Sequence, residues 1–249
     1  MVLLRHGEST ANAEGRFTGW WDVPLTTRGC EQARQAANLL AAAGFVPDVI
    51  FASPLQRTTQ TAEIIVHTLG HPAIPVVRRP ELTERAYGAL TGLSKAEVRD
   101  VFGAARSQWW RRSMTGLPPR VGEAGPALRP GQVLPHRDNT MEILTAAEHR
   151  ESLADVVARV RTWQAGQLVP RLAAGKNVLV VAHGNSLRAL VAHLDHLDDD
   201  EVGALNIPTG QPLRYSVDNQ GQPLPRSGRY LDPDTARAAA QAVAAEGGT

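Results

Sequence analysis

Short apolar runs that alternate with helical stretches set the strongest limit on how this chain can fold. The runs lie at residues 2–4, 49–51, 74–77 and 178–182. Between them, apolar residues recur at helical spacing, most clearly over residues 27–43, 55–69 and 151–172. Strands that are apolar on both faces belong to parallel sheets that helices cover on both sides. We therefore expect an α/β protein, a three-layer α/β/α sandwich with a mainly parallel central sheet.

We expect the whole chain, residues 1–249, to form one domain, because its length suits a single α/β core. Residues 94–113 look helical, with Ser94 as the capping residue. The Gly- and Pro-rich stretch at about 115–134 cannot hold a long helix or a central strand, so it predicts a surface excursion near the site. The Ala-rich tail from about residue 232 lacks a bulky apolar stripe, and we expect it to be mobile.

Composition limits the classes of function. A formal net charge of +1 argues against a nucleic-acid-binding surface, which is usually strongly basic. No apolar run is long enough to span a membrane, and the first residues lack the order of a signal peptide, so we expect a cytoplasmic protein without membrane partners. The single cysteine, Cys30, excludes a disulfide framework and a cysteine-cluster metal site within this chain.

Two of the expected strands are each followed by a His-Gly pair. Arg5-His6-Gly7-Glu8 follows the first strand, and His183-Gly184 follows the strand at 178–182. Ligands of open α/β sheets bind outside the carboxyl ends of the strands, so the two histidines can face each other across one pocket. A single histidine at a strand end can arise by chance, but a pair flanked by arginines suits phosphoryl transfer through a phosphohistidine.

Further motifs narrow the assignment. They are Arg5-His6-Gly7-Glu8-Ser9, Asn12, residues 16–20 (RFTGW), residues 82–88 (LTERAYG), Trp110-Arg111-Arg112, residues 183–186 (HGNS) and residues 206–210 (NIPTG). With them the chain resembles, nearly end to end, the cofactor-dependent phosphoglycerate mutases of the histidine phosphatase superfamily. The first His-Gly motif alone indicates only the superfamily, which includes many phosphatases. The Thr18-Gly19-Trp20 loop, the block at 84–88 with Lys95, and the paired arginines narrow the resemblance to mutases.

The resemblance implies a metal-independent enzyme, an isomerase of glycolysis and gluconeogenesis that interconverts 3-phosphoglycerate and 2-phosphoglycerate. It implies 2,3-bisphosphoglycerate as the cofactor that primes a phosphohistidine at His6. It also implies small phosphoglycerates as the binding partners, and a homodimer or homotetramer as the assembly.

The resemblance also assigns roles to residues. His6 is the nucleophile, while Arg5, Arg57 and His183 surround the transferring phosphoryl group. Glu84 shuttles the proton, a role that suits a carboxyl whose pKa a nearby phosphate raises. A mutase must hold a substrate with both a phosphate and a carboxylate, which several cations permit. The remaining implied substrate contacts are Gly7, Glu8, Ser9, Asn12, Thr18, Gly19, Arg85, Tyr87, Lys95, Arg111, Arg112, Gly184 and Asn185.

The chain departs from the family pattern in two places, and alternatives stay open. Thr83 and Ala86 replace polar residues beside Glu84, and the stretch at 113–150 diverges most, which leaves the balance of mutase and phosphatase activity undecided. One alternative is a phosphomonoesterase of the same superfamily, in which water is the acceptor. Another is a catalytically silent phosphate-ligand sensor. The His193-x-x-His196 spacing resembles a metal site but lies on a helix flank, and we assign it no metal.

Overall fold

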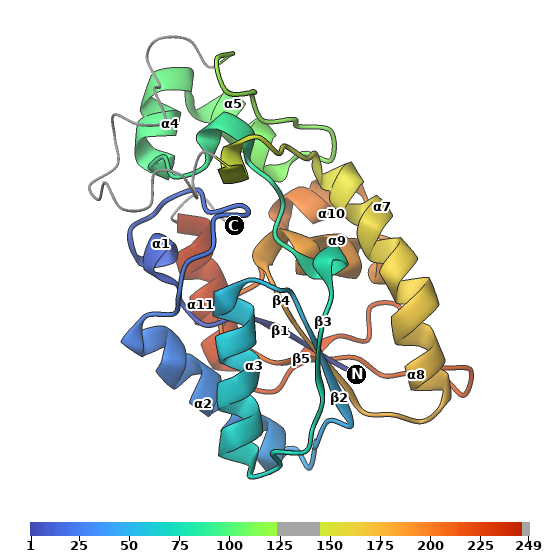
Figure 1. The fold of residues 1–249 in the computed structure, drawn as a ribbon. Coiled ribbons are helices and arrows are strands. Elements are labelled where there is room, and N and C mark those ends of the chain that lie inside the picture. Colours follow the sequence, from blue (N-terminus) through green and yellow to red (C-terminus); the bar gives the residue numbers. More distant parts are fainter. Residues whose placement is uncertain (124–144, 246–249) are drawn as a thin grey trace.

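The computed structural model describes residues 1–123 and 145–245, and within them one six-stranded sheet has the order β3-β2-β4-β1-β5-β6 (Figure 1). Its first four strands pair in parallel, while the last two pair antiparallel at one edge. The strands are β1 (Val2–Arg5), β2 (Val49–Ala52), β3 (Val76–Arg78), β4 (Val178–Ala182), β5 (Leu213–Arg214) and β6 (Arg229–Tyr230). The expected mainly parallel sheet is confirmed.

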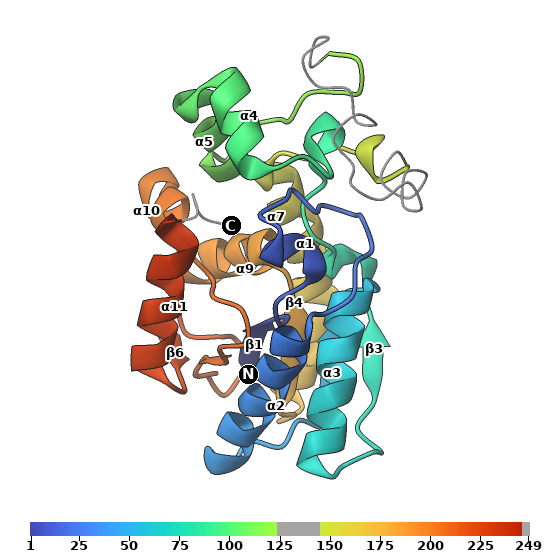
Figure 2. The ribbon, with the colours of Figure 1, turned by 90° about the vertical axis from the view of Figure 1, so that its left-hand side faces the viewer.

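Helices cover both faces of the sheet, as expected for three layers (Figures 1 and 2). Successive strand residues point to opposite faces, so alternate residues join different cores. Leu4, Ile50 and Val181 pack in one core with α2 (Thr27–Ala42) and α3 (Gln56–Leu69). Leu3, Phe51 and Val180 pack in the other core with α7 (Leu153–Trp163) and α9 (Gly184–Asp195).

The remaining helices are short, apart from the last. They are α1 (Thr10–Ala13), α4 (Lys95–Phe102), α5 (Ala104–Arg112), α8 (Val169–Ala173), α10 (Asp199–Ala204), α11 (Pro233–Ala245), the single turns η1 (Pro80–Leu82) and η2 (Gly88–Leu90), and a π-helical turn, η4 (Gln164–Leu168). The expected cap at Ser94 is present, because its side chain accepts a hydrogen bond from the Glu97 amide. Thr26 caps α2 in the same way by accepting one from the Gly29 amide.

Two continuous helices expected from the sequence are interrupted. Residues 94–113 form α4 and α5, separated at Gly103, whose φ of 81° lies outside the helical region. The helix expected over 151–172 contains the π-helical turn just before Pro170, which has no backbone N–H with which to continue the hydrogen-bond ladder. Strand β5 is short, over Leu213–Arg214, and the Tyr215 amide extends its antiparallel pairing with β1 by donating to the Met1 carbonyl.

The stretch at 115–134 and the tail from residue 232 were expected to lie outside the core. Most of the excursion at 115–134 lies outside the described residues, and residues 115–123 form no helix or strand. Residues 233–245 of the tail form α11, which contacts β6 and buries Ala236 (Figure 2). Ala242 and Val243 of α11 line a groove together with Arg5. The mobility of this tail stays a prediction.

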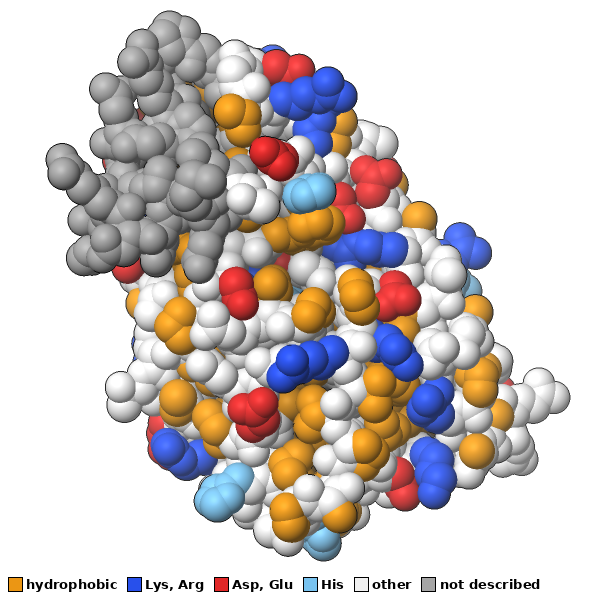
Figure 3. Space-filling model, viewed as in Figure 1, with side chains coloured by type: hydrophobic (Ala, Val, Ile, Leu, Met, Phe, Trp, Pro, Cys, Tyr) orange, Lys and Arg blue, Asp and Glu red, His pale blue; other side chains and the backbone are white. Residues whose placement is uncertain are grey.

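The surface fits the nearly balanced charge. On the face shown in Figure 3, basic and acidic side chains are interspersed. Among the helices of the described residues, none combines the length and the apolar character needed to cross a bilayer.

Candidate active site

The two histidines meet at the carboxyl ends of neighbouring strands. Strands β1 and β4 pair in parallel with Arg5 opposite Ala182, so the residue that follows each strand emerges at the same place. The rings of His6 and His183 lie 5.0 Å apart between centroids, inclined by 65°. Both are buried, with 2% and 0% of their surfaces exposed. The structure thus brings together the pair that the sequence predicted.

Hydrogen bonds give the two rings opposite tautomers. Nδ1 of His6 lies 2.6 Å from the Gly7 carbonyl oxygen, and because that oxygen only accepts, Nδ1 carries the proton and Nε2 keeps its lone pair. Nδ1 of His183 accepts from Nε of Arg57 at 3.2 Å, so the proton of its neutral ring sits on Nε2. That Nε2 is buried and has no hydrogen-bond partner in the described part of the chain. One ring therefore offers a nucleophilic nitrogen and the other offers a donor.

Electrostatics keep both rings neutral. Burial, followed by the charges of Arg57 and Arg5, lowers the pKa of His6 well below its ordinary value. Burial and then Arg57 act in the same way on the pKa of His183. A neutral imidazole is the form that can attack phosphorus.

Arg57 joins the histidine pair to the loop at 18–21. Its guanidinium donates to the Trp21 and Gly19 carbonyl oxygens, each at 2.9 Å, as well as to His183. Burial lowers the pKa of Arg57 to about 10, which still leaves it charged at neutral pH. Arg57 therefore fixes the ring of His183, while its charge lies beside both imidazoles.

Main-chain donors hold Glu84 in a small pocket that Arg5, the neighbour of His6, also lines. Its carboxylate accepts from the Arg85 amide at 2.7 Å and from the Asn185 amide at 3.2 Å. Its carbonyl oxygen accepts from Nε1 of Trp20 at 2.7 Å and from Arg159 at 3.2 Å. The pocket is lined by Arg5, Asn12, Arg16, Phe17, Thr18, Gly19, Glu84, Tyr87, Lys95 and Asn185. A carboxylate so held can exchange a proton with a ligand in this pocket.

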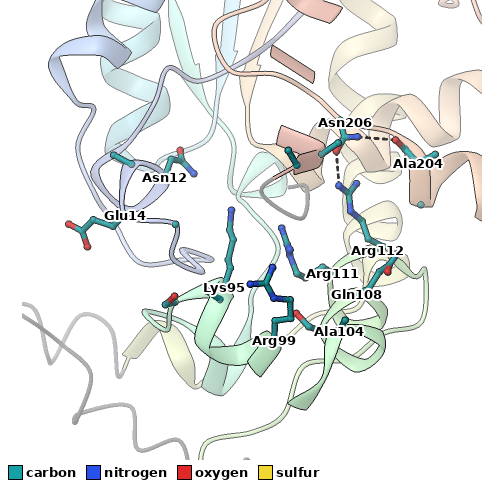
Figure 4. A pocket seen from close by; sticks show the side chains of 18 residues that line it. Asn12, Glu14, Lys95, Arg99, Ala104, Gln108, Arg111, Arg112, Ala204 and Asn206 are labelled. Carbon is teal, nitrogen blue, oxygen red and sulfur yellow. Dashed lines mark hydrogen bonds between the residues drawn. The ribbon is translucent and has the colours of Figure 1, made fainter. Parts of the chain in front are cut away.

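The expected second group of cations lies in an adjoining pocket of about 840 Å³ (Figure 4). Lys95 is the first residue of α4. Arg111 and Arg112 are the last two residues of α5, and the dipole of that helix favours positive charge at its C-terminus. Arg112 donates to the Leu205 carbonyl at 3.1 Å and to Oδ1 of Asn206 at 2.6 Å. Burial, together with the charge of Arg111, lowers the pKa of Arg112 to about 10. This pocket is built to receive an anion.

Arg85 adds a second indication of an anionic ligand. The residue has no exposed surface, and its three guanidinium nitrogens have no hydrogen-bond partner within the described residues. The guanidinium lies 4.9 Å from the centre of the Tyr87 ring. Burying an unpaired charge is costly, and a bound carboxylate or phosphate would offset that cost.

Two of the expected substrate contacts, Gly7 and Glu8, make close contacts within the protein. The Gly7 amide donates to Oγ1 of Thr61 at 3.2 Å, and the expected contact of Gly7 with the substrate stays a prediction. The close backbone approach at Gly7 is to Gly29 of α2, because a Cβ there would collide with the Gly29 carbonyl. The Glu8 carboxylate accepts from Oγ1 of Thr26, the capping residue of α2.

Asn12 and the start of α9 remain directed to the pocket. Oδ1 of Asn12 accepts from the Ser9 amide and hydroxyl, which leaves its Nδ2 as the group available to a ligand. Buried Ser9 thus acts as the cap of α1. Gly184 is the first residue of α9, so the positive end of that helix faces the site.

Sequence reasoning missed some residues that support the site. Trp20 and Arg159 hold the Glu84 carbonyl, and Arg159 also donates to Glu81 and to the Glu151 carboxylate. Arg99 lines the larger pocket beside Lys95 (Figure 4). Trp20 lay within a recognised motif, but the arginines carried no local signal. Within the described residues, no group of three or more His, Cys, Asp or Glu side chains could hold a metal ion.

Comparisons of sequence agree with this geometry. The chain matches the family model of the histidine phosphatase superfamily (branch 1) over residues 1–130 and 132–227. It is 46% identical over 249 residues to the 2,3-bisphosphoglycerate-dependent phosphoglycerate mutase of Thermobifida fusca, covering 99% of this chain and 98% of that protein. The proteins of the same name from Corynebacterium efficiens and Mycobacterium tuberculosis H37Rv are 44% and 46% identical, each covering 97% of its own length and 100% and 99% of this chain.

Comparisons of structure give the same fold. "Mycobacterial hydrolase 1" superposes with a TM-score of 0.67 at 25% identity, covering 92% of this chain and 95% of that one. A mycobacterial glucosyl-3-phosphoglycerate phosphatase with inorganic phosphate gives a TM-score of 0.66 at 25% identity, covering 92% and 94%.

Proposed function

Because the chain belongs to the histidine phosphatase superfamily (branch 1), we infer from it and from the site that the protein is a 2,3-bisphosphoglycerate-dependent phosphoglycerate mutase. Relatives of 43–46% identity over nearly the full length carry this name. The enzyme interconverts 3-phosphoglycerate and 2-phosphoglycerate, a step of glycolysis and gluconeogenesis. One observation carries the proposal beyond the family. The neutral histidine pair adjoins a second, separate cluster of cations formed by Lys95, Arg111 and Arg112.

The residues present fit an anionic phosphoryl cofactor. The buried Nε2 of His183 and the guanidinium of Arg85 are donors without hydrogen-bond partners among the described residues, and both would be satisfied by phosphate or carboxylate oxygens. 2,3-Bisphosphoglycerate, when bound, supplies the phosphoryl group that primes the enzyme. Arg5, His6, Arg57 and His183 would hold that group, and Lys95, Arg85, Arg111 and Arg112 would hold the rest of the molecule.

In the chemical step, Nε2 of His6 forms a bond to phosphorus as the bond from phosphorus to the leaving oxygen breaks. The Gly7 carbonyl holds the Nδ1 proton and so stabilises the positive charge that develops on the ring. His183 donates its Nε2 proton as a hydrogen bond to a phosphoryl oxygen, and the charges of Arg5 and Arg57 stabilise the same oxygens. Positioning and electrostatics carry the step.

Glu84 manages the proton of the sugar-acid hydroxyl. When phospho-His6 donates, Glu84 takes the proton that the accepting hydroxyl loses, and in the reverse transfer it returns a proton to the leaving oxygen. Asn185 and Arg85 fix the carboxylate through their amides, which directs it to the hydroxyl that faces His6. The second cation cluster retains the anion while the other carbon's oxygen exchanges into place.

The test is to find the phosphohistidine and its preferred acceptor. Incubation with 2,3-bisphosphoglycerate should leave an acid-labile phosphate on His6, and His6→Asn, which preserves the bond to Gly7, should abolish it. The phosphoenzyme should then be discharged faster by 3-phosphoglycerate than by water. Faster discharge by water would identify a phosphatase, and failure to trap any phosphoenzyme would support a silent phosphate-binding protein. We further propose, from the resemblance alone, a cytoplasmic enzyme that forms a homodimer or homotetramer and needs no metal.

A further inference from the structure

Arg188 is a buried cation that lies between the two ends of the active site without belonging to either. It stands one helical turn after Asn185 on α9 and has no exposed surface. Its NH1 donates to Oδ1 of Asn185 at 2.7 Å and to the Arg111 carbonyl at 3.4 Å, and its Nε donates to the Leu205 carbonyl at 3.1 Å. One guanidinium thus joins α9, the end of α5 and the residue after α10.

These bonds reach the second cation cluster from behind. The Leu205 carbonyl that accepts from Arg188 also accepts from Arg112 at 3.1 Å. The next residue, Asn206, accepts the other branch of the Arg112 guanidinium (Figure 4). The Arg111 carbonyl is held by Arg188 itself. Arg188 therefore sets where the backbone at 111 and 205 lies, and through it where the Arg112 side chain points.

The same guanidinium orients the catalytic end. A side-chain amide has one accepting and one donating end, so a donor on Oδ1 of Asn185 decides which way the amide faces. With Oδ1 on Arg188, Nδ2 of Asn185 donates to the Tyr87 hydroxyl at 3.0 Å. The backbone amide of Asn185 holds the Glu84 carboxylate. The proton-carrying group and the second anion site thus share one anchor.

Burying the Arg188 guanidinium carries a free-energy cost. Burial, with the charge of Arg112, lowers the pKa of Arg188 to about 9, which marks the cost of placing a guanidinium there. A planar fork that reaches three directions at once is a geometry that neither lysine nor an apolar side chain provides.

We propose that Arg188 is a positioning residue that couples the phosphoryl-transfer end of the pocket to the second anion site, acting through Asn185, Arg111 and Arg112 without touching the substrate. The proposal rests on the proposed function, because it assigns the second site to the phosphoglycerate. Loss of Arg188 should therefore damage recognition of the whole substrate more than recognition of a lone phosphoryl group.

The first experiment compares Arg188→Met and Arg188→Lys with wild type. We expect KM for 3-phosphoglycerate to rise about tenfold to a hundredfold, because misplaced cations lose substrate binding. Inhibition by vanadate, which mimics only the transferring group held near His6, should stay within about twofold. Leu194→Ala, a buried change further along α9, controls for loss of stability, and it should not separate the two readouts. Arg188→Lys keeps a charge at this site and remains informative where Arg188→Met fails to fold.

The second experiment is a double-mutant cycle with Arg112→Ala. If Arg188 acts through Arg112, the combined rise in KM should be clearly smaller than the product of the two single effects. Multiplicative effects, equal losses of vanadate and phosphoglycerate binding, or wild-type KM values in Arg188→Lys would each overturn the proposal. Turnover of 3-phosphoglycerate by wild type, measured alongside, tests the proposed function separately. A wild type that only releases phosphate would refute mutase activity. The comparison of KM for 3-phosphoglycerate with inhibition by vanadate would still test the role of Arg188.

Discussion

Lowering the pH should destabilise the fold through the two buried histidines. Their pKa values are lowered by burial and by Arg57, so the folded protein keeps both rings neutral below the ordinary pKa of 6.5. The unfolded chain binds those protons, and the free energy of unfolding therefore falls as the pH drops from about 6.5 towards the folded pKa values. The contribution of the two neutral rings to the free energy of unfolding is fully present above this pH range and is lost as the pH falls through it.

The size of the effect follows from linkage. A ring that stays neutral in the folded protein and has an ordinary pKa in the unfolded chain lowers the free energy of unfolding by about 1.4 kcal/mol at pH 5.5 and by almost nothing at pH 7.5. The two rings together therefore lower it by about 2.8 kcal/mol at pH 5.5. The N-terminal amine, whose pKa burial lowers to about 6, also titrates in this range. Because every variant shares that amine, its contribution cancels when variants are compared.

The assay is urea denaturation at pH 7.5 and 5.5, compared between wild type and two variants. In His6→Asn the new amide still donates to the Gly7 carbonyl, and in His183→Asn the new oxygen still accepts from Arg57. Each variant should lose about 1.4 kcal/mol less than wild type between the two pH values. His71→Asn, at an exposed position after α3, controls for removing an imidazole. Equal pH losses in wild type and both site variants would refute the neutral histidine pair, and with it the tautomer argument.

Two other changes test the chemistry. Glu84→Gln keeps the shape and the bonds from the Arg85 and Asn185 amides but cannot carry a proton, so turnover should fall about a hundredfold to ten-thousandfold in a steady-state assay; near-normal turnover would place the proton carrier elsewhere. Truncation after Leu231 removes α11, which lines the groove beside Arg5, and should raise phosphate release relative to isomerisation while His6 still becomes phosphorylated. An unchanged ratio with full activity would show that the tail does not shield the site.

Local pattern was enough to predict the layers of the fold and the meeting of His6 and His183. Short apolar runs such as 178–182 are typical of buried strands, and a residue that follows such a strand emerges at its carboxyl end. His6 and His183 were therefore predictable as a pair. The motif around Glu84 and the paired arginines at 111–112 identified the rest of the site by resemblance. The breaks at Gly103 and before Pro170 were missed, although both residues signal them, because the helical periodicity continues on either side.

What the sequence alone determined, then, was which side chains are candidates for the chemistry and which strands carry them, because those depend on residue type and on neighbours along the chain. Only the tertiary structure decided how they are aimed. The tautomer of His183 depends on Arg57, 126 positions away, and the Glu84 carboxylate depends on the Asn185 amide, 101 positions away. Arg188 contacts the Arg111 carbonyl across 77 positions. No local spacing encodes such contacts, since they exist only once the packing of the sheet and its helices brings these segments within hydrogen-bond distance.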